Sequence, residues 1–212
     1  ILISAGPTRE KIVPVRFISN RSSGKMGYAI AEAAVKKGHK VTLVSGPVNI
    51  SAPRHVKMIK TESARDMVRE IRKIAPKADL IIMAAAVSDY TPVKSSIKNR
   101  KIKKNSKNMT VTLKATEDIL ASLGRNKRAN QILVGFAAET EDLLKNAAGK
   151  LEKKNLDWII ANDVSQKGIG FDSDYNEVVM ISKDGLEIKI PKESKKNIAK
   201  KIIGIVCPKG RR

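Results

Sequence analysis

The sequence predicts an α/β fold: a doubly wound, mainly parallel sheet with a β-hairpin added near the C-terminus. Short apolar runs alternate with segments of helical periodicity along most of the 212 residues. Aromatic residues make up only 3% of the chain, so the core must consist of Ile, Val, Leu, Met and Ala, as in parallel sheets buried on both faces. A hydrophobic content of 42% supplies one substantial core, so we expect a single domain over residues 1–212.

The first βαβ unit lies between two strands that end in similar turns. Residues 1–4 form an apolar run closed by Gly6-Pro7, and residues 41–44 form another closed by Gly46-Pro47. Between them, apolar residues recur at helical spacing: Met26, Ala29, Ile30, Ala33 and Ala34. The pair Lys37-Gly38 then indicates the end of this helix.

The alternation continues through the middle of the chain. A short strand after His55 and a helix at residues 67–74 precede a central strand, for which the apolar run predicts residues 80–87. Further strands are expected at residues 132–136 and 158–161, with a helix between them from about residue 141 to residue 154.

The last part of the chain has a different pattern. Residues 178–181 and 186–190 flank the turn Lys183-Asp184-Gly185, which is typical of a β-hairpin. Residues 193–206 then have the periodicity of a closing helix.

The composition narrows the possible functions. The formal charge of +21 would attract nucleic acid, nucleotides or another polyphosphate. The lone Cys207 excludes a disulfide framework and a cysteine-based zinc site. No apolar run approaches the length of about 18 residues that a membrane-spanning helix needs, so we expect a cytoplasmic protein without membrane contact. Because the chain begins inside a strand, a further N-terminal domain is expected.

A basic segment at residues 94–107 interrupts the alternation of strands and helices. It holds seven Lys or Arg residues with Ser and Asn between them. Two interpretations stay open: a run of solvated charge, or a flap at about residues 91–109 that closes a lysine onto a polyphosphate.

Residues 19–27 precede the first helix, where backbone N–H groups and the helix dipole can hold a phosphate. The segment is not a P-loop, because Ser19 replaces its first glycine and Met26 replaces its Ser or Thr. It is not a dinucleotide fingerprint either, because Ser22 replaces the first glycine of that motif. A capping and turn role explains its glycines equally well.

Asp89 follows the central strand, at the edge where α/β proteins bind ligands. Its carboxylate suits Mg²⁺ or a sugar hydroxyl, or simply the cap of a helix or turn. The small residues 84–86 permit close approach of a ligand or of a packed helix. Ser45 stands where a dinucleotide site would have an acidic residue, which counts against a dehydrogenase.

Taken together, these segments form an ordered series: AGPTRE at residues 5–10, PVRFISN at 14–20, SSGKMG at 22–27, AAVSDY at 85–90, KIKK at 101–104, GFAAET at 135–140 and ANDV at 161–164. The series resembles phosphopantothenoylcysteine synthetase, the C-terminal half of a bifunctional coenzyme A biosynthesis protein. The resemblance extends from Ile1 to about Gly204.

This resemblance implies a Rossmann-like fold and a two-step ligation. The carboxylate of 4'-phosphopantothenate attacks the α-phosphate of a nucleoside triphosphate, and pyrophosphate leaves. The resemblance implies that this nucleotide is CTP and that Mg²⁺ accompanies it. The amine of L-cysteine then attacks the acyl-nucleotidylate, and the nucleoside monophosphate leaves. Such chemistry needs cations and backbone N–H groups more than an acid–base pair.

The resemblance also implies residue roles, with the metal ligands unassigned. Asn20, Arg16 and Lys101 are expected to be catalytic, Asn20 through an amide that can bind an oxyanion and Arg16 in the cysteine-dependent step. Ser22, Gly24 and Ala86 are expected to bind substrate together with Asn20 and Lys101. The residues implied for nucleotide binding are Met83, Ala84, Ala85, Asp89, Lys101, Thr116, Glu117, Asp118, Ile119, Phe136, Lys150 and Lys154.

The sequence departs from the family pattern at Glu117, where proline is usual, so the local loop geometry is open. From the resemblance we expect a homodimer with contacts at about residues 162–191, and fusion to an N-terminal flavin-dependent decarboxylase. Two other classes remain as alternatives. A basic nucleic-acid-binding module would use residues 94–107, although the sequence offers hardly any aromatic residues for base stacking. A Rossmann oxidoreductase is the weakest of the three.

Overall fold

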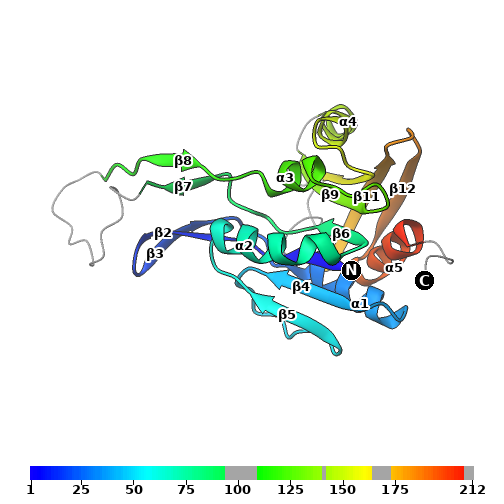
Figure 1. Ribbon diagram of the computed structural model, residues 1–212, viewed down its shortest axis with the longest axis horizontal. Helices are drawn as coiled ribbons and strands as arrows, with labels where there is room; N and C mark the ends of the chain where they lie inside the picture. The colour runs from blue at the N-terminus through cyan, green and yellow to red at the C-terminus, as the bar shows by residue number, and fades with distance from the viewer. Residues whose placement is uncertain (94–108, 140–141, 164–172, 208–212) are drawn as a thin grey trace.

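Figure 1 shows the computed structural model, which describes residues 1–93, 109–139, 142–163 and 173–207. Its main sheet consists of β1 (Leu2–Ala5), β4 (Val41–Ser45), β5 (Val56–Lys60), β6 (Leu80–Met83), β9 (Ile132–Glu139), β10 (Trp158–Asp163), β11 (Tyr175–Ser182) and β12 (Glu187–Ser194). The helices are α1 (Lys25–Lys36), α2 (Ala64–Ile74), the short 3-10 helix η1 (Ala75–Lys77), α3 (Ile119–Arg125), α4 (Leu143–Lys153) and α5 (Lys195–Val206).

The eight strands lie in the order β12-β11-β10-β9-β6-β1-β4-β5. The strands from β10 to β5 are parallel, and β11 and β12 add an antiparallel hairpin. β1 pairs with both β4 and β6, so the strand order reverses at its carboxyl end. This arrangement confirms the predicted doubly wound sheet and its C-terminal hairpin, and it places a ligand-binding crevice at that edge.

Helices cover both faces of the sheet. On one face, Ile3, Leu80 and Ile82 pack with residues of α1 and α5. On the other, Leu2, Ile81 and Met83 pack with residues of α2, α3 and α4. Neighbouring strand residues therefore serve opposite cores, because side chains alternate across a strand. This explains why the strands are continuously apolar in sequence.

The central strand is shorter than predicted, because β6 ends at Met83 and not at Val87. Beyond Met83 the backbone bonds to a side chain of β1 and to the loop after β1: Ala85 N–H donates to Ser4 Oγ at 3.1 Å and Ala86 N–H to Gly6 O at 2.9 Å. The apolar run thus continues past the sheet. β9 and β10 extend further than predicted, to Glu139 and Asp163.

Two hairpins that the sequence did not predict project from one end of the molecule (Figure 1). One pairs β2 (Arg9–Val13) with β3 (Arg16–Ser19), and the other pairs β7 (Tyr90–Pro92) with β8 (Leu113–Ala115). Their strands are short and, apart from β7, contain charged residues, which is why the pattern did not reveal them. The basic segment between β7 and β8 lies outside the described residues from 94 to 108.

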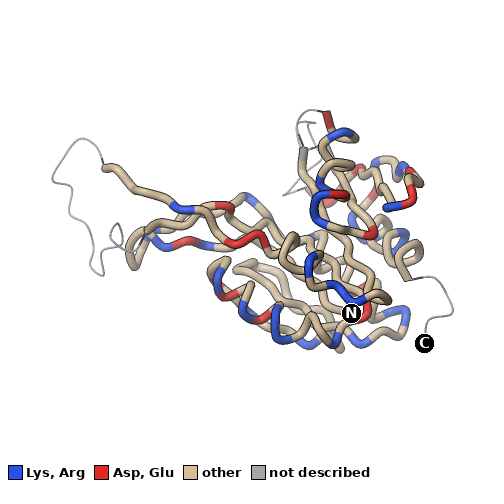
Figure 2. The backbone as a smooth tube through the Cα atoms, turned by 45° about the horizontal axis from the view of Figure 1, so that its top comes forward, with Lys and Arg blue, Asp and Glu red and all other residues tan. Residues whose placement is uncertain are grey.

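Figure 2 shows that Lys and Arg are spread over the helices and hairpins, with Asp and Glu among them. α2 illustrates this mixture, because Arg69 and Lys73 each form an ion pair with Glu70. No helix among the described residues has the length and apolar character needed to cross a bilayer.

Gly46 is required where the loops after β1 and β4 meet. A Cβ atom there would lie 1.7 Å from the Pro7 carbonyl oxygen, which belongs to the backbone. We expect Gly46→Ala to lower the free energy of unfolding by about 3 kcal/mol or more, because the loops must separate. Chemical denaturation would measure this change.

Gly149→Ala is the matched control for this prediction. Gly149 lies inside α4, and a Cβ atom there would meet nothing within 4 Å. The control should raise the free energy of unfolding by about 0.5–1 kcal/mol, since alanine favours a helix. A Gly46→Ala protein as stable as the wild type would contradict the close approach at Pro7.

Candidate active site

A cleft of about 670 Å³ lies at the carboxyl edge of the parallel strands. It runs from the segment before α1, past the residues that follow β6, to the ends of β9 and β10 and to α3 and α4. The described residues with predicted roles that line it are Asn20, Ser22, Gly24, Met83, Ala84, Ala85, Ala86, Asp89, Thr116, Glu117, Asp118, Ile119, Phe136, Lys150 and Lys154.

Two of the predicted catalytic residues, Arg16 and Lys101, are not among the described residues that line the cleft. Arg16 is exposed on β3, in the projecting hairpin, and does not line the cleft. Lys101 lies outside the described residues.

Asn20 connects the segment before α1 to the segment after β6. Its Nδ2 donates to the carbonyl oxygens of Ala86, at 3.0 Å, and Val87, at 3.3 Å. Both acceptors are carbonyl groups, so they determine which end of the amide carries the hydrogens. The oxygen Oδ1 is then the end available to a ligand. In this state Asn20 offers a ligand an acceptor, whereas the oxyanion role implied by the family resemblance needs a donor.

The glycines before α1 have a packing role. Gly24, at φ 78°, is the N-cap of α1, and a Cβ atom there would lie 2.8 Å from Val48 Cγ1. A Cβ atom at Gly27 would lie 2.6 Å from Ala5 Cβ. The glycines therefore permit close contact between this segment and the sheet.

The same helix end retains the properties of an anion site. The N-cap residue Gly24 has no side chain to cap the N-terminus of α1, and the first turn contains no acidic residue. The N–H of Gly24 donates to Ser22 Oγ at 3.3 Å. A helix N-terminus with a glycine cap and no acidic side chain suits a phosphate site. The turn interpretation and the phosphate interpretation are therefore compatible.

Hydrogen bonds hold the chain around Asp89 at the rim of the cleft. Thr116 N–H donates to Asp89 O at 2.8 Å, and Thr116 Oγ1 donates to Ser88 O at 2.6 Å. Asp89 directly precedes the strand β7, so it does not cap a helix. Its carboxylate is exposed and, among the described residues, forms no hydrogen bond or ion pair.

On the opposite side of the cleft, Asp118 caps α3 and contacts the end of α4. Its Oδ1 accepts from Ala121 N–H at 2.9 Å, and its Oδ2 lies 2.9 Å from Lys154 Nζ. Burial alone would raise the pKa of Asp118, but these two donors lower it below its ordinary value. Lys150 and Lys154 are four residues apart and both line the cleft.

Glu117, the departure from the family pattern, does not disturb this arrangement. Its carboxylate forms an ion pair with Arg72 of α2 at 2.5 Å. The next residue, Asp118, still caps α3.

The cleft offers limited coordination for a metal. Among the described residues, the carboxylates that line it are Asp89, Glu117 and Asp118, and the last two are paired with Arg72 and Lys154. No cluster of three or more potential metal-ligating side chains occurs within the described parts of the chain. Mg²⁺ commonly takes one or two carboxylates and completes its shell with phosphates and water. Asp89 fits that requirement.

Residues that the sequence did not identify as ligand-binding also line the cleft. Asn176, at the start of β11, and Lys195, at the start of α5, reach it from the C-terminal part of the chain. Asn162 and Lys25 line it as well, and both belong to quoted motifs without an assigned role. For Asn176 and Lys195 the sequence offered no motif, because only the folded hairpin brings them to this edge.

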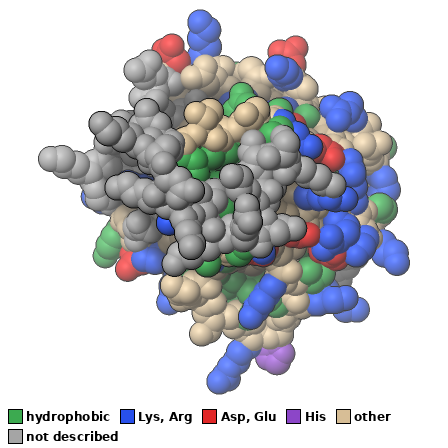
Figure 3. All heavy atoms as spheres, turned by 90° about the vertical axis from the view of Figure 1, so that its left-hand side faces the viewer, with side chains coloured by type: hydrophobic (Ala, Val, Ile, Leu, Met, Phe, Trp, Pro, Cys, Tyr) green, Lys and Arg blue, Asp and Glu red, His purple; other side chains and the backbone are tan. Residues whose placement is uncertain are grey.

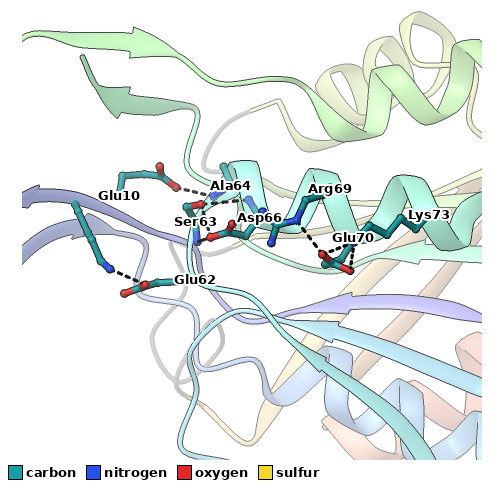
Figure 4. Close-up of polar contacts among 9 residues, drawn as sticks. Glu10, Glu62, Ser63, Ala64, Asp66, Arg69, Glu70 and Lys73 are labelled. Atoms are coloured by element: carbon teal, nitrogen blue, oxygen red, sulfur yellow. Dashed lines mark hydrogen bonds and ion pairs between the residues drawn. The ribbon is translucent and has the colours of Figure 1, made fainter. Parts of the chain in front are cut away.

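A larger groove of about 840 Å³ lies between α2 and the two projecting hairpins. Figure 4 shows its charged side chains paired with one another and with backbone groups. Glu10 accepts from Ala64 N–H at 2.8 Å, and Ser63 and Asp66 form a reciprocal capping box on α2. The charged side chains of the groove therefore serve to position α2.

Comparison with known proteins agrees with this geometry. Residues 1–208 match the family described as "DNA/pantothenate metabolism flavoprotein C-terminal domain". The coenzyme A biosynthesis bifunctional protein CoaBC of Bacillus subtilis is 47% identical over 96% of this chain and 50% of that protein. The protein of the same name from Vibrio parahaemolyticus is 49% identical over 96% of this chain and 51% of that protein.

The chain thus spans about half the length of these relatives. The crystal structure of the C-terminal domain of CoaBC has a TM-score of 0.80 and 43% identity, covering 97% of this chain and 92% of that one. The crystal structure of the DNA/pantothenate metabolism flavoprotein from Streptococcus pneumoniae has a TM-score of 0.81 and 26% identity, covering 97% of this chain and 96% of that one. The chain therefore belongs to the family of DNA/pantothenate metabolism flavoprotein C-terminal domains, which includes the C-terminal half of CoaBC.

Proposed function

We propose that this chain is a phosphopantothenate–cysteine ligase that acts in coenzyme A biosynthesis through an acyl-nucleotidylate. One observation carries the proposal: the described residues implied for nucleotide and for substrate line a single cleft. The names of the CoaBC relatives support the pathway. A more distant protein of similar fold, Cab2 mutant H337A, is described in complex with phosphopantothenate-cysteine, which is the product expected here.

In the first step, a carboxylate oxygen of 4'-phosphopantothenate bonds to the α-phosphorus of the triphosphate. The bond from that phosphorus to the β-phosphate oxygen breaks, and pyrophosphate leaves with the electron pair. Both reactants are anions, so the cleft must supply positive charge and N–H donors. Lys150 and Lys154 supply cations on the α4 side, and the first turn of α1 supplies donors.

In the second step, the amine of L-cysteine attacks the acyl carbon. The bond from that carbon to the phosphate oxygen breaks, the nucleoside monophosphate leaves, and the nitrogen loses a proton to water. The sulfur of Cys207 has no part in this step, because the reacting cysteine is the free amino acid that serves as substrate. We propose CTP as the nucleotide and the backbone of Met83, Ala84 and Ala85 as the region that selects its base.

Mg²⁺ is proposed to accompany the triphosphate. When bound, it neutralises phosphate charge and polarises the reacting phosphorus. Asp89 is the residue that would hold it, because the other two carboxylates of the cleft are paired with Arg72 and Lys154. Lys154 would have to exchange Asp118 for a phosphate oxygen when the nucleotide binds.

Arg16 requires a separate explanation, because it lies outside the cleft of its own chain. We propose that the chain forms a homodimer in which Arg16 enters the cleft of the partner. Val15, Phe17 and Tyr90 are 65%, 47% and 56% exposed, and exposed apolar side chains gathered on the projecting hairpins are typical of an interaction surface. Figure 3 faces this end of the molecule and shows hydrophobic side chains beside the undescribed atoms, with Lys and Arg side chains around the outline.

The interface expected at residues 162–191 remains a second proposal for the dimer contact. Tyr175 and Leu186 are exposed apolar residues in this region, and residues 164–172 lie outside the described chain. Fusion to an N-terminal decarboxylase in the full-length protein is also a proposal. It is supported by the CoaBC relatives, of which the chain covers about half.

The proposed function is tested by pyrophosphate release from the purified chain with Mg²⁺, 4'-phosphopantothenate and L-cysteine. Each nucleoside triphosphate is supplied in turn. Release that requires both phosphopantothenate and one nucleotide supports the ligase and identifies the nucleotide. Chelation of Mg²⁺ by EDTA should stop it. No release with any triphosphate would contradict the proposed function.

Lys101→Gln tests the flap proposal. If Lys101 contacts the triphosphate, loss of its charge should lower kcat/KM for the nucleotide by about 10- to 100-fold, the value of one or two charge-assisted hydrogen bonds. Steady-state kinetics with varied nucleotide would measure it. Lys94→Gln is the matched control, because it removes the same charge from the same basic segment outside the KIKK motif. Equal kinetics for both variants would mean that the segment is solvated charge.

A further inference from the structure

Most charged side chains that line the cleft already interact with other groups of the chain: Lys25, Glu117, Asp118, Lys150, Lys154 and Lys195. Arg21 and Asp89 differ from them, because the side chain of neither forms a hydrogen bond or an ion pair with the described residues. Both residues are exposed and line the cleft. An anion can therefore contact the Arg21 guanidinium without displacing a carboxylate of the protein.

Arg21 and Asp89 lie on the two sides of one hydrogen-bonded contact. Asn20, directly before Arg21, donates through Nδ2 to the carbonyl oxygens of Ala86 and Val87, at 3.0 Å and 3.3 Å. Asp89 follows two residues after Val87. The free guanidinium and the free carboxylate thus belong to neighbouring segments in the same part of the cleft.

Thr8 holds both of these segments. It is 0% exposed. Its carbonyl oxygen accepts from Ser19 Oγ at 2.7 Å, and its Oγ1 accepts from Ser88 N–H at 3.0 Å. Ser19 is two residues before Arg21, and Ser88 directly precedes Asp89. The backbone that carries the two charges is therefore fixed before a ligand binds, which reduces the ordering cost of binding.

We propose that Arg21 binds the β- and γ-phosphates of the triphosphate, which leave as pyrophosphate. A guanidinium suits this group because its planar pair of N–H donors contacts two phosphate oxygens at once. Asp89, on the neighbouring segment, would hold the Mg²⁺ that accompanies the same phosphates. The exposed position of Arg21 fits a group that returns to solvent during the reaction. This assignment rests on the proposed function and adds a residue to its nucleotide site.

Arg21 acts in the first step by its charge and not by proton transfer. When the bond from the α-phosphorus to the β-phosphate oxygen breaks, the electron pair moves to pyrophosphate. The guanidinium stays protonated and stabilises the negative charge that gathers there. Pyrophosphate has left before the second step, so Arg21 has no direct effect on the attack by the cysteine amine.

Calorimetry with Mg²⁺ and either CTP or CMP tests this role without relying on turnover, because CMP lacks the β- and γ-phosphates. Arg21→Met should raise the Kd for CTP by about 10- to 100-fold, the value of one or two charge-assisted hydrogen bonds, and leave the Kd for CMP unchanged. Arg21→Lys should recover only part of the loss, because lysine keeps the charge but lacks the paired donors.

Arg54→Met is the matched control. Arg54 is exposed, and it lines neither the cleft nor the groove beside α2. Its substitution removes the same charge and should change neither Kd. An equal rise of the Kd for CTP and CMP in Arg21→Met, or an unchanged Kd for CTP, would overturn the role of Arg21. Absence of CTP binding by the wild-type chain would overturn it as well.

The ligase and the role of Arg21 can fail separately. A wild-type chain that releases no pyrophosphate, yet binds CTP more tightly than Arg21→Met does and CMP equally, contradicts the ligase and supports the phosphate site. Phosphopantothenate-dependent pyrophosphate release, together with an unchanged Kd for CTP in Arg21→Met, supports the ligase and overturns the role of Arg21.

Discussion

Asn20→Asp is expected to lower kcat/KM by about 1,000-fold or more. Asn20 donates through Nδ2 to the carbonyl oxygens of Ala86 and Val87, which follow the central strand. An ionised aspartate keeps the shape of the side chain but loses both donors, so a carboxylate oxygen would face two carbonyl oxygens. It also adds negative charge to a cleft proposed to bind two anions, where misplaced charge costs most.

Asn126→Asp is the matched control. Asn126 donates through Nδ2 to Ser122 O at 2.8 Å, at the end of α3, and does not line the cleft. The control therefore loses a similar hydrogen bond and gains the same charge elsewhere. We expect it to retain nearly normal pyrophosphate release. If Asn20→Asp turns over as fast as this control, Asn20 has no role in the reaction.

Single-turnover measurements separate the two roles that Asn20 can have. If Asn20 shapes the segment at Ala86, formation of the acyl-nucleotidylate should slow, because the backbone that contacts the nucleotide moves. If its Oδ1 accepts from the cysteine amine, the second step should slow instead. The oxyanion role would require the amide to leave both carbonyl groups when substrate binds, with a cost of about 1 kcal/mol for each hydrogen bond.

The main sheet could be predicted because its strands are buried on both faces. Runs such as residues 80–83 need no partner information to be identified as apolar strands. The end of β6 could not be predicted, because Ala84, Ala85 and Ala86 are as apolar as the strand itself. Only in the folded chain do Ala85 and Ala86 leave the sheet, with their N–H groups donating to Ser4 Oγ and to Gly6 O.

The site was predictable wherever its residues lie in local motifs. Asn20, Gly24, Asp89 and Asp118 each belong to one continuous segment, and the sheet edge then brings these segments together. Asn176 and Lys195 have no such motif. Their contribution depends on the pairing of β11 with β10 and on the packing of α5 with α1, and both join segments that are well separated in the chain.

The orientation of the Asn20 amide could not be predicted from the sequence either. Motif resemblance assigns the residue to the reaction, but the direction of its amide depends on two carbonyl groups that lie more than 60 residues away in the chain. The same holds for the position of Arg16, which the resemblance assigns to the reaction and the hairpin places outside the cleft of its own chain.

The second large effect is expected for Arg16: a heterodimer of two weakly active variants should regain activity. If Arg16 acts in the cleft of the partner, Arg16→Ala alone should lower kcat/KM by about 100-fold or more, as loss of a positioned cation does. A heterodimer of Arg16→Ala and Asn20→Asp chains has one cleft with both defects and one with neither. Purified heterodimers should then recover about half of the wild-type activity, because a two-fold dimer has two equivalent sites.

Two differently tagged chains, co-expressed and purified through both tags, would provide that heterodimer. A heterodimer of Arg16→Ala with wild type is the control for the tags and should also retain about half of the activity. If Arg16 instead reaches the cleft of its own chain, each site of the mixed dimer carries one defect, and activity stays near that of the separate variants. The experiment thus distinguishes a shared site from a self-contained one by a difference of about 50-fold. Arg16→Lys should restore little, because a lysine lacks the planar pair of donors that a guanidinium offers to a phosphate or a carboxylate.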